Sequence, residues 1–372
     1  MKTYGMWILL FIIVQAALTA AQYFAAGKPK RLPLRIVLIT AKALIAAAFA
    51  LLVMAGPTAL RPVQPLLTAI YVVLLPDAAA DLITLILFRR ERKFRHLRLA
   101  SLVLGVVFFV YGTVNMQIVT PDDHTLISPK LSEPHRIVFV SDLHVGSSQS
   151  FETTRRTIEK IDAEHPDFVI LGGDITDDYT TKAEMEETYR LFGALGVPVY
   201  WIDGNHEIVQ HPEYAEIEYT YDELLDALKQ NGIVVLRDEY AGLAPDLMLL
   251  GREDLADPSK RQPVEKPDTE QFFLVADHQP TSIQEHLALG ADLQLSGHTH
   301  AGQFFPLRLL YPLFTPTYGE YEYGGAMLIV SAGAGGWRFP FRTEAHCSFE
   351  VVDLLPAEDQ DITSSSATAS GI

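Results

Sequence analysis

The residues of this sequence that could do chemistry are aspartates, histidines and one asparagine, which stand in five short groups between residues 142 and 300. Ligands that offer oxygen and nitrogen without a thiolate suit hard to borderline divalent cations, rather than a structural zinc or a copper(I) ion. The groups therefore predict a site for manganese, iron(II), zinc or nickel. The candidate ligands are Asp142, His144, Asp174, Asn205, His278, His298 and His300.

This set of seven side chains is too large for one metal ion. If two ions share one carboxylate, the seven side chains supply eight metal contacts. Coordination positions then remain for a bridging hydroxide and for substrate oxygens. Two cations about 3.5–4 Å apart can lower the pKa of a bridging water, orient it in line with phosphorus and neutralise charge in the transition state. The set thus predicts a two-metal hydrolytic centre, with manganese as the first expectation.

The elements that must position these ligands are short β-branched runs that alternate with segments of helical period. Helices between buried strands predict an α/β layered domain. The ligand groups follow the ends of predicted strands, and this edge is where open α/β sheets bind ligands. The expected strands are 137–140, 168–171, 197–202, 233–236, 247–250, 272–275, 293–295 and 327–330, and the expected helices lie near 151–164, 181–195, 221–230 and 281–289.

Five motifs in a fixed order carry a resemblance to a known family. They are Asp-x-His from residue 142, Gly-Asp-x-x-Asp from 173, Gly-Asn-His-Glu from 204, the isolated His278 and Gly-His-x-His from 297. Together they resemble the calcineurin-like metallophosphoesterase superfamily over roughly residues 135–350. The resemblance implies an α/β sandwich of two mixed sheets flanked by helices. The longer Gly-His-Thr-His-Ala-Gly-Gln is similar to the bacterial branch in which the domain follows membrane helices, as in animal transmembrane proteins with a metallophosphoesterase domain.

The resemblance also implies a role for each site residue. His206 would contact the phosphoryl group and protonate the leaving oxygen, and Asp177 would orient His206, although the adjacent Asp178 could compete for this role. The implied ligands are Asp142, His144 and His300 for one metal and Asn205, His278 and His298 for the other, with Asp174 bridging the two.

One departure from the family narrows the expected substrate. Asp178 stands where the protein Ser/Thr phosphatases of the superfamily have a phosphate-binding arginine, so dephosphorylation of phosphoproteins is disfavoured. Arg338, after a predicted strand, could instead meet a substrate phosphate or simply be solvated. Single histidines without a motif are left out of the site, namely His135, His165, His211 and His286.

Charge divides the chain into a basic front and an acidic back. Residues 1–118 contain thirteen of the 29 Lys and Arg residues and three of the 46 Asp and Glu residues. The rest of the chain therefore has sixteen basic and 43 acidic residues, a formal charge of −27. Such a charge repels polyphosphate backbones, so no nucleic-acid partner is expected, whereas small phosphorylated molecules or lipids remain candidate substrates. The only cysteine, Cys347, excludes an intrachain disulfide and leaves the compartment open.

The front of the chain reads as a multi-pass membrane region. Four apolar stretches, near 5–26, 35–56, 65–88 and 99–118, each reach the roughly 20 residues that span a bilayer. Basic residues concentrate between the first and second and between the third and fourth stretches, so both loops should be cytoplasmic. The following domain is then expected outside the cytoplasm of a bacterial cell. The alternative is a signal peptide over 1–21.

The expected organisation is a transmembrane region, a linker, a metallophosphoesterase domain and a disordered tail, at residues 1–118, 119–134, 135–356 and 357–372. The leading function is hydrolysis of phosphomonoesters or phosphodiesters, with a lipid or envelope component as one option for the substrate. A nucleotidase or cyclic-nucleotide phosphodiesterase is the alternative enzyme. The alternative of another class is a membrane sensor or scaffold that binds metal or phosphate without turnover. Asp77 and Asp81, within the third apolar stretch, could act as a relay or contact a lipid headgroup. Alternatively, the helix is shifted or kinked so that both only face the helix bundle.

Overall fold

The computed structural model describes residues 33, 37, 95–209, 217–303, 305, 307–313, 315–337 and 340–357. The chain forms two compact units. The first comprises Met1–Asn115 with Arg338–Thr343, and the second comprises Met116–Trp337 with Glu344–Ile372. Each unit is described by itself.

In the first unit the described helix is α4, Arg95–Asn115, which overlaps the predicted stretch at 99–118. Within the part of the chain that the structure describes, no helix combines the length and the apolar character needed to cross a membrane. The other three predicted stretches, the alternative signal peptide, Asp77 and Asp81 lie outside the described residues.

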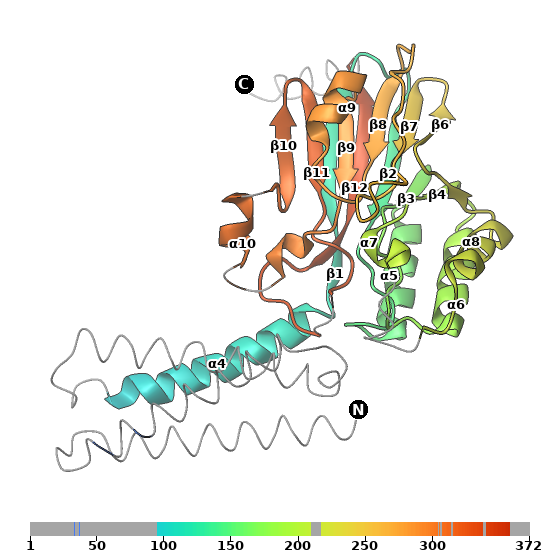
Figure 1. Ribbon diagram of the computed structural model, residues 1–372. Coiled ribbons are helices and arrows are strands. Elements are labelled where there is room, and N and C mark those ends of the chain that lie inside the picture. Colours follow the sequence, from blue (N-terminus) through green and yellow to red (C-terminus); the bar gives the residue numbers. More distant parts are fainter. Residues whose placement is uncertain are drawn as a thin grey trace, which may run out of the picture. The chain divides into compact units, whose positions relative to one another are not determined.

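The second unit is built on two six-stranded sheets that face each other (Figure 1). Their facing surfaces form one apolar core, in which Ile137 and Phe139 of one sheet meet Leu249 and Leu274 of the other. Both sheets contain parallel and antiparallel pairs, so the predicted sandwich of two mixed sheets is confirmed. The strand orders are β1-β12-β2-β3-β4-β5 and β10-β11-β9-β8-β7-β6.

The strands of the first sheet are β1 (Val119–Ser128), β12 (Cys347–Pro356), β2 (His135–Val140), β3 (Phe168–Leu171), β4 (Val199–Trp201) and β5 (Val234–Val235). Those of the second are β10 (Gly319–Tyr323), β11 (Ala326–Val330), β9 (Leu293–Ser296), β8 (Phe272–Ala276), β7 (Leu247–Gly251) and β6 (Glu239–Ala244). The helices of this unit are α5 (Phe151–Ala163), α6 (Lys182–Gly193), α7 (Asn205–Ile208), α8 (Tyr221–Gln230), α9 (Ile283–Leu289) and α10 (Leu307–Leu310), with short 3₁₀ turns η4 (His300–Gly302) and η5 (Tyr311–Leu313).

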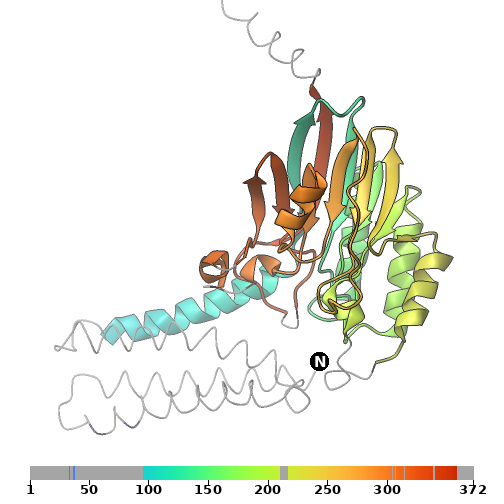
Figure 2. The same ribbon diagram turned by 45° about the horizontal axis from the view of Figure 1, so that its top comes forward.

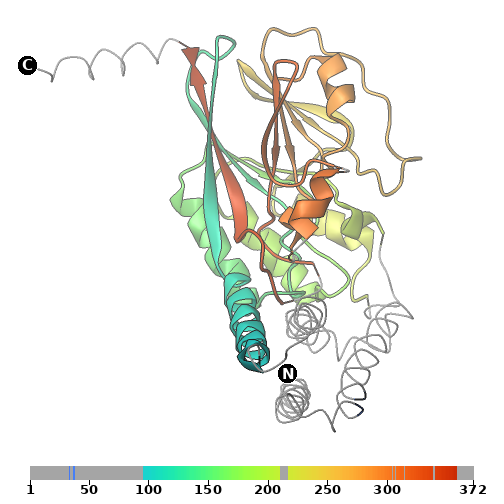
Figure 3. The same ribbon diagram turned by 90° about the vertical axis from the view of Figure 1, so that its left-hand side faces the viewer.

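Helices cover the outer face of each sheet. Helices α5, α6 and α8 pack on the first sheet, where Ile161, Phe192 and Leu228 join the apolar cluster of its outer face (Figure 1 and Figure 2). The second sheet carries α9, whose Ile283 packs against Leu328 of β11 (Figure 3). The inner strands are buried on both faces, which is why they appear in the sequence as uninterrupted apolar runs.

The structure corrects the predicted linker at 119–134. Residues 119–128 form β1, which pairs in parallel with β12 along its whole length. The strand was missed because it lies at the edge of its sheet, where Pro121 and Asp122 are tolerated and partly exposed residues interrupt the apolar pattern. Strands β6, β10 and β12 are also absent from the predicted set.

His124 of β1 connects the edge strands of the two sheets. Its Nε2 lies 2.8 Å from Glu350 of β12, and its Nδ1 lies 2.6 Å from Glu320 of β10. Burial by itself would lower the pKa of His124, but the two carboxylates outweigh it and raise this pKa to about 9. A protonated His124 therefore stabilises the contact between the sheets.

We expect His124→Gln to lower the free energy of unfolding by roughly 2 kcal/mol at pH 6, after discounting for the exposed Glu320. A group whose pKa is raised on folding adds to the free energy of unfolding. For His124 this stabilisation is complete below the unfolded pKa of 6.5 and is lost as the pH rises through about 9. Thermal unfolding of both proteins between pH 6 and pH 10 measures this. A difference in unfolding midpoint that stays constant up to pH 10 would contradict the assignment.

Candidate metal centre

All seven predicted ligands lie on loops that follow the carboxyl ends of parallel strands. Asp142 and His144 follow β2, Asp174 follows β3, and Asn205 opens α7 after β4. The remaining three come from the second sheet, His278 after β8 and His298 and His300 after β9. The two sheets thus bring their ligand loops to one end of the sandwich, as the strand-to-loop positions predict.

The first group contains Asp142, His144 and His300, all buried. Nε2 of His144 lies 3.2 Å from Nε2 of His300, and the latter lies 3.4 Å from Oδ1 of Asp142. Two nitrogens that each lie about 2.1 Å from one metal ion are about 3.0–3.4 Å apart, depending on the angle between the bonds. The spacing of this group therefore fits a single cation.

The second group contains Asp174, His278 and His298. Nδ1 of His278 lies 2.9 Å from the carbonyl oxygen of Gly172, an acceptor that fixes the proton on Nδ1 and directs the lone pair of Nε2 to the group. Oδ2 of Asp174 lies 3.2 Å from Nε2 of His278 and 3.7 Å from Nε2 of His144. One carboxylate oxygen thus stands between the two groups.

Asn205 supplies an independent test of whether cations fit here. Its side-chain oxygen Oδ1 is buried and has no hydrogen-bond partner among the described residues. A buried carbonyl oxygen without a donor is expensive to leave unpaired, and a divalent cation satisfies it. The residues present therefore fit the two-metal centre that the motifs predict.

The backbone at these ligands is strained. Asp142, His144, Asp174, His298 and His300 all have φ between 44° and 71°, in the left-handed region that side chains other than glycine rarely adopt. Such strain persists only where the surrounding structure enforces it, and it clusters at functional sites.

Close approach of the loops adds a second constraint on the backbone. A Cβ added to Gly204 would overlap the backbone nitrogen and Oδ1 of Asp174, so these two loops can meet only with glycine at position 204.

Asp177, which the resemblance implied as a partner of His206, contacts the ligand His144. Its Oδ2 lies 3.0 Å from Nδ1 of His144, and its Oδ1 accepts a hydrogen bond of 2.8 Å from the backbone of Tyr179. Both oxygens are thus engaged on the side of His144. A carboxylate at Nδ1 fixes the tautomer of the imidazole and leaves its Nε2 to a metal.

His206 stands beside the first ligand group. Its ring centroid lies 5.1 Å from that of His144 and 6.3 Å from that of Trp337. Oδ2 of Asp178 lies 3.9 Å from Nδ1 of His206, which is too long for a hydrogen bond. Of the two aspartates considered, Asp178 is therefore the one that faces His206.

Burial and charge set the protonation of the cluster. Burial lowers the pKa of His206 and of His298. For His144 burial acts in the same direction, but Asp177, Asp174 and Asp142 outweigh it and raise the pKa to about 9. A carboxylate-rich site that raises the pKa of an imidazole attracts other cations for the same reason.

Glu207 lies inside a motif but is not among the predicted site residues. This side chain is 2% exposed and accepts hydrogen bonds from the backbone nitrogens of Asp174, Thr176 and Gly204, at 2.8, 3.0 and 2.9 Å. It therefore joins the loop after β3 to the start of α7. The available signal was the spacing of three residues between Gly204 and Glu207, which is typical of a helix N-terminus.

Arg261 is a second residue that the sequence did not reveal. Its guanidinium is 7% exposed and lies 2.8 Å from the buried carboxylate of Asp277, the residue that precedes His278. It also donates to the carbonyl oxygen of Glu253, 2.9 Å away. This pair fixes the end of β8 and hence the start of the His278 loop.

The histidines left out of the site have other surroundings. His135 pairs with Asp246 at 2.7 Å, and the second oxygen of Asp246 accepts from Ser132, so this cluster needs no cation. His286 lies 2.8 Å from Gln294, and His165 is exposed beyond α5. His211 and Arg338 lie outside the described residues.

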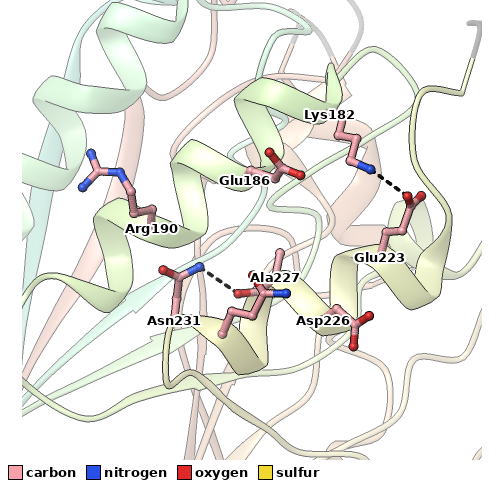
Figure 4. Close-up of a pocket in the computed structure, with 8 residues that line it drawn as sticks. Lys182, Glu186, Arg190, Glu223, Asp226, Ala227 and Asn231 are labelled. Carbon is pink, nitrogen blue, oxygen red and sulfur yellow. Dashed lines mark hydrogen bonds and ion pairs between the residues drawn. The ribbon is translucent and has the colours of Figure 1, made fainter.

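A surface groove between α6 and α8 contains none of the candidate ligands (Figure 4). Lys182 at one end of it pairs with Glu223 at 2.7 Å, and Asn231 donates to the carbonyl oxygen of Ala227 at 2.8 Å. The Lys182–Glu223 pair thus joins the two helices, and no ligand is inferred there. The lining residues are Lys182, Glu186, Arg190, Glu223, Asp226, Ala227, Gln230 and Asn231.

The sequence of residues 135–302 matches the family described as calcineurin-like phosphoesterase. The chain is 31% identical over 239 residues to an uncharacterized metallophosphoesterase of Helicobacter pylori, a match that covers 61% of each chain. It is 30% identical over 276 residues to the transmembrane protein with metallophosphoesterase domain of Danio rerio, covering 69% of this chain and 62% of that relative. The chain thus spans about three fifths of the length of both relatives. The match and the site geometry agree: this chain carries a calcineurin-like metallophosphoesterase domain.

Proposed function

We propose that this chain hydrolyses phosphomonoesters or phosphodiesters with two divalent metal ions. The observation that carries the proposal is the placement of Asp174 between two groups of nitrogen and oxygen ligands, with His206 alongside. The first ion would be held by Asp142, His144 and His300, the second by Asn205, His278 and His298, and Asp174 would contact both.

The bound ions would supply an activated water and offset the charge that develops on the phosphoryl group. Manganese is the ion that we propose first, with iron(II), zinc and nickel as alternatives, because the ligand set has no thiolate.

His206 would move a proton to the leaving oxygen. It is an imidazole beside the ligands that is not needed to complete either group, so it can act on the substrate instead of on a metal. The interaction of Asp177 with His144 instead supports a ligand.

We propose that the reaction takes place at a membrane surface. The support is the set of apolar stretches in residues 1–118 and the name of the Danio rerio relative, a transmembrane protein. A bilayer partner and a domain outside the cytoplasm follow from the positions of the basic loops. Reporter fusions after residue 130 test this placement, and an active cytoplasmic reporter would refute it.

Metal-free protein supplied with single divalent ions and a panel of substrates tests the function. We expect no turnover without metal, activity with manganese on an aryl phosphomonoester or diester, and two ions bound per chain. The panel should include a phospholipid phosphomonoester, a nucleoside monophosphate and a cyclic nucleotide, because their rate ratios separate a lipid phosphatase from a nucleotidase. Two bound ions without hydrolysis of any ester would favour a sensor or scaffold.

A further inference from the structure

An exposed apolar segment directly follows the last ligand loop. We define the apolar loop as the described residues 303, 305, 307–313 and 315–317, which include α10 and η5. Its central sequence, Phe-Phe-Pro-Leu-Arg-Leu-Leu-Tyr-Pro-Leu-Phe, contains no acid, and none occurs between Asp292 and Glu320. Exposed fractions are 48% for Phe305, 67% for Leu309 and 74% for Leu313. Large apolar side chains grouped in this way on a surface mark an interaction site.

Both ends of the apolar loop form hydrogen bonds next to the candidate metal centre. Gln303, three residues after His300, receives a hydrogen bond of 3.0 Å from the backbone nitrogen of Trp337 and donates one of 3.2 Å to its carbonyl oxygen. At the other end, Thr299 donates to the carbonyl oxygen of Thr317, which is buried. The two ends of the apolar loop are thus fixed close to the ligand loop that carries His298 and His300.

Trp337 extends the apolar surface towards the site. Its indole is 37% exposed, and its ring centroid lies 6.3 Å from that of His206. A substrate bound with its phosphoryl group at the metals would therefore have aromatic and aliphatic surface on this side. That surface can accept the apolar part of an amphiphile.

We propose that the apolar loop enters the interface of a lipid bilayer and so presents the metal centre to phosphoesters of membrane lipids. This inference rests on the proposed function and adds to it the surface that reaches the substrate. Leucine and aromatic residues flanking one arginine are the composition of interfacial anchors.

Charge favours a bilayer over an acidic protein partner. Arg308 is exposed at the centre of the apolar loop, and it is the only charged residue between Asp292 and Glu320. A cation in this position complements anionic lipid headgroups. The apolar stretches in residues 1–118 place a bilayer next to the domain in the proposed organisation, whereas no feature of the described residues points to a protein partner.

The first test measures the depth of the loop. Full-length Leu313→Cys protein is labelled with an environment-sensitive fluorophore and reconstituted into vesicles of phosphatidylglycerol and brominated phosphatidylcholine. Labelling is selective because the only natural cysteine, Cys347, is buried. We expect bromine to quench the label at least about twofold, as for a side chain buried roughly 5–10 Å into the interface. Val234→Cys, 44% exposed on β5 of the other sheet, is the matched control and should not be quenched. An unquenched label at residue 313, as a protein-docking face would give, overturns the proposal.

The second test separates the loop from the chemistry. We expect the double variant Leu309→Asp, Leu313→Asp to hydrolyse phosphatidic acid added to vesicles of this composition about tenfold more slowly than the wild type. A soluble aryl phosphate should be hydrolysed at a rate within about twofold of the wild type. Val234→Asp should leave both rates unchanged. Equal losses on both substrates would overturn the role in reaching lipid. If the wild type hydrolysed neither ester, the proposed function would fail, but quenching would still decide whether the loop enters the bilayer.

Discussion

His206→Ala is expected to lower kcat about 10²- to 10⁴-fold for an ester with a poor leaving group, because a positioned proton donor contributes an effect of this size. The variant should keep both metal ions, since His206 belongs to neither ligand group. Its backbone nitrogen, which donates to Oδ1 of Asp174 at 2.8 Å, is retained in alanine. Kinetics and metal content measured on the same preparation check both statements.

The leaving group distinguishes proton donation by His206 from simple binding of phosphate. A 4-nitrophenolate leaves without much help from an acid, whereas an alkoxide requires a proton in the transition state. The loss in His206→Ala should therefore be small for 4-nitrophenyl phosphate and large for an alkyl phosphate. An equal loss for the two substrates would mean that His206 binds the phosphoryl group instead.

A matched histidine variant controls for nonspecific damage. His165→Asn changes an exposed histidine beyond α5 at φ 52°, a conformation that asparagine tolerates. It should hydrolyse both substrates at the wild-type rate.

The ligand positions could be predicted because each is encoded locally. Asp142 and His144 follow one buried strand and Asp174 follows the next, so the strand pattern alone brings them to the same edge. Hydrogen bonds between loops are not encoded in this way. Whether Asp177 faces His144 or His206 depends on how the loop curls after Asp174, and neighbouring residues gave no indication of it.

The core strands could likewise be predicted from the sequence, whereas the edge strands could not. Strands β2 and β3 are continuous apolar runs because sheets and helices cover both of their faces. Edge strands β1 and β10 need an apolar pattern on one face at most. They also carry His124 and Glu320, which pair with each other between the two sheets. Such a contact requires the tertiary structure to be known first.

Glu207→Gln is the second large effect that we expect, and it acts through the backbone of the ligand loops. The glutamate receives three backbone donors, and the amide nitrogen of glutamine can accept none of them. At least one buried N–H then faces another donor. An unpaired buried N–H should reduce the free energy of unfolding of the metal-free protein by about 1–3 kcal/mol. Chemical unfolding of the metal-free proteins measures this difference.

The same substitution should weaken metal binding about 10- to 100-fold, as expected for residues that position ligands without touching the metal. Burial and the neighbouring Asp174 raise the pKa of Glu207 to about 8, so a nearby cation is needed to keep this carboxylate charged at neutral pH. Metal binding and the three hydrogen bonds of Glu207 should therefore reinforce each other. Glu184→Gln, an equal change at the capping box of α6, is the control and should leave the metal affinity unchanged. If Glu207→Gln lowers stability but binds manganese as tightly as the wild type, Glu207 supports only the fold, and the link between the loop after β3 and α7 does not set the ligand geometry.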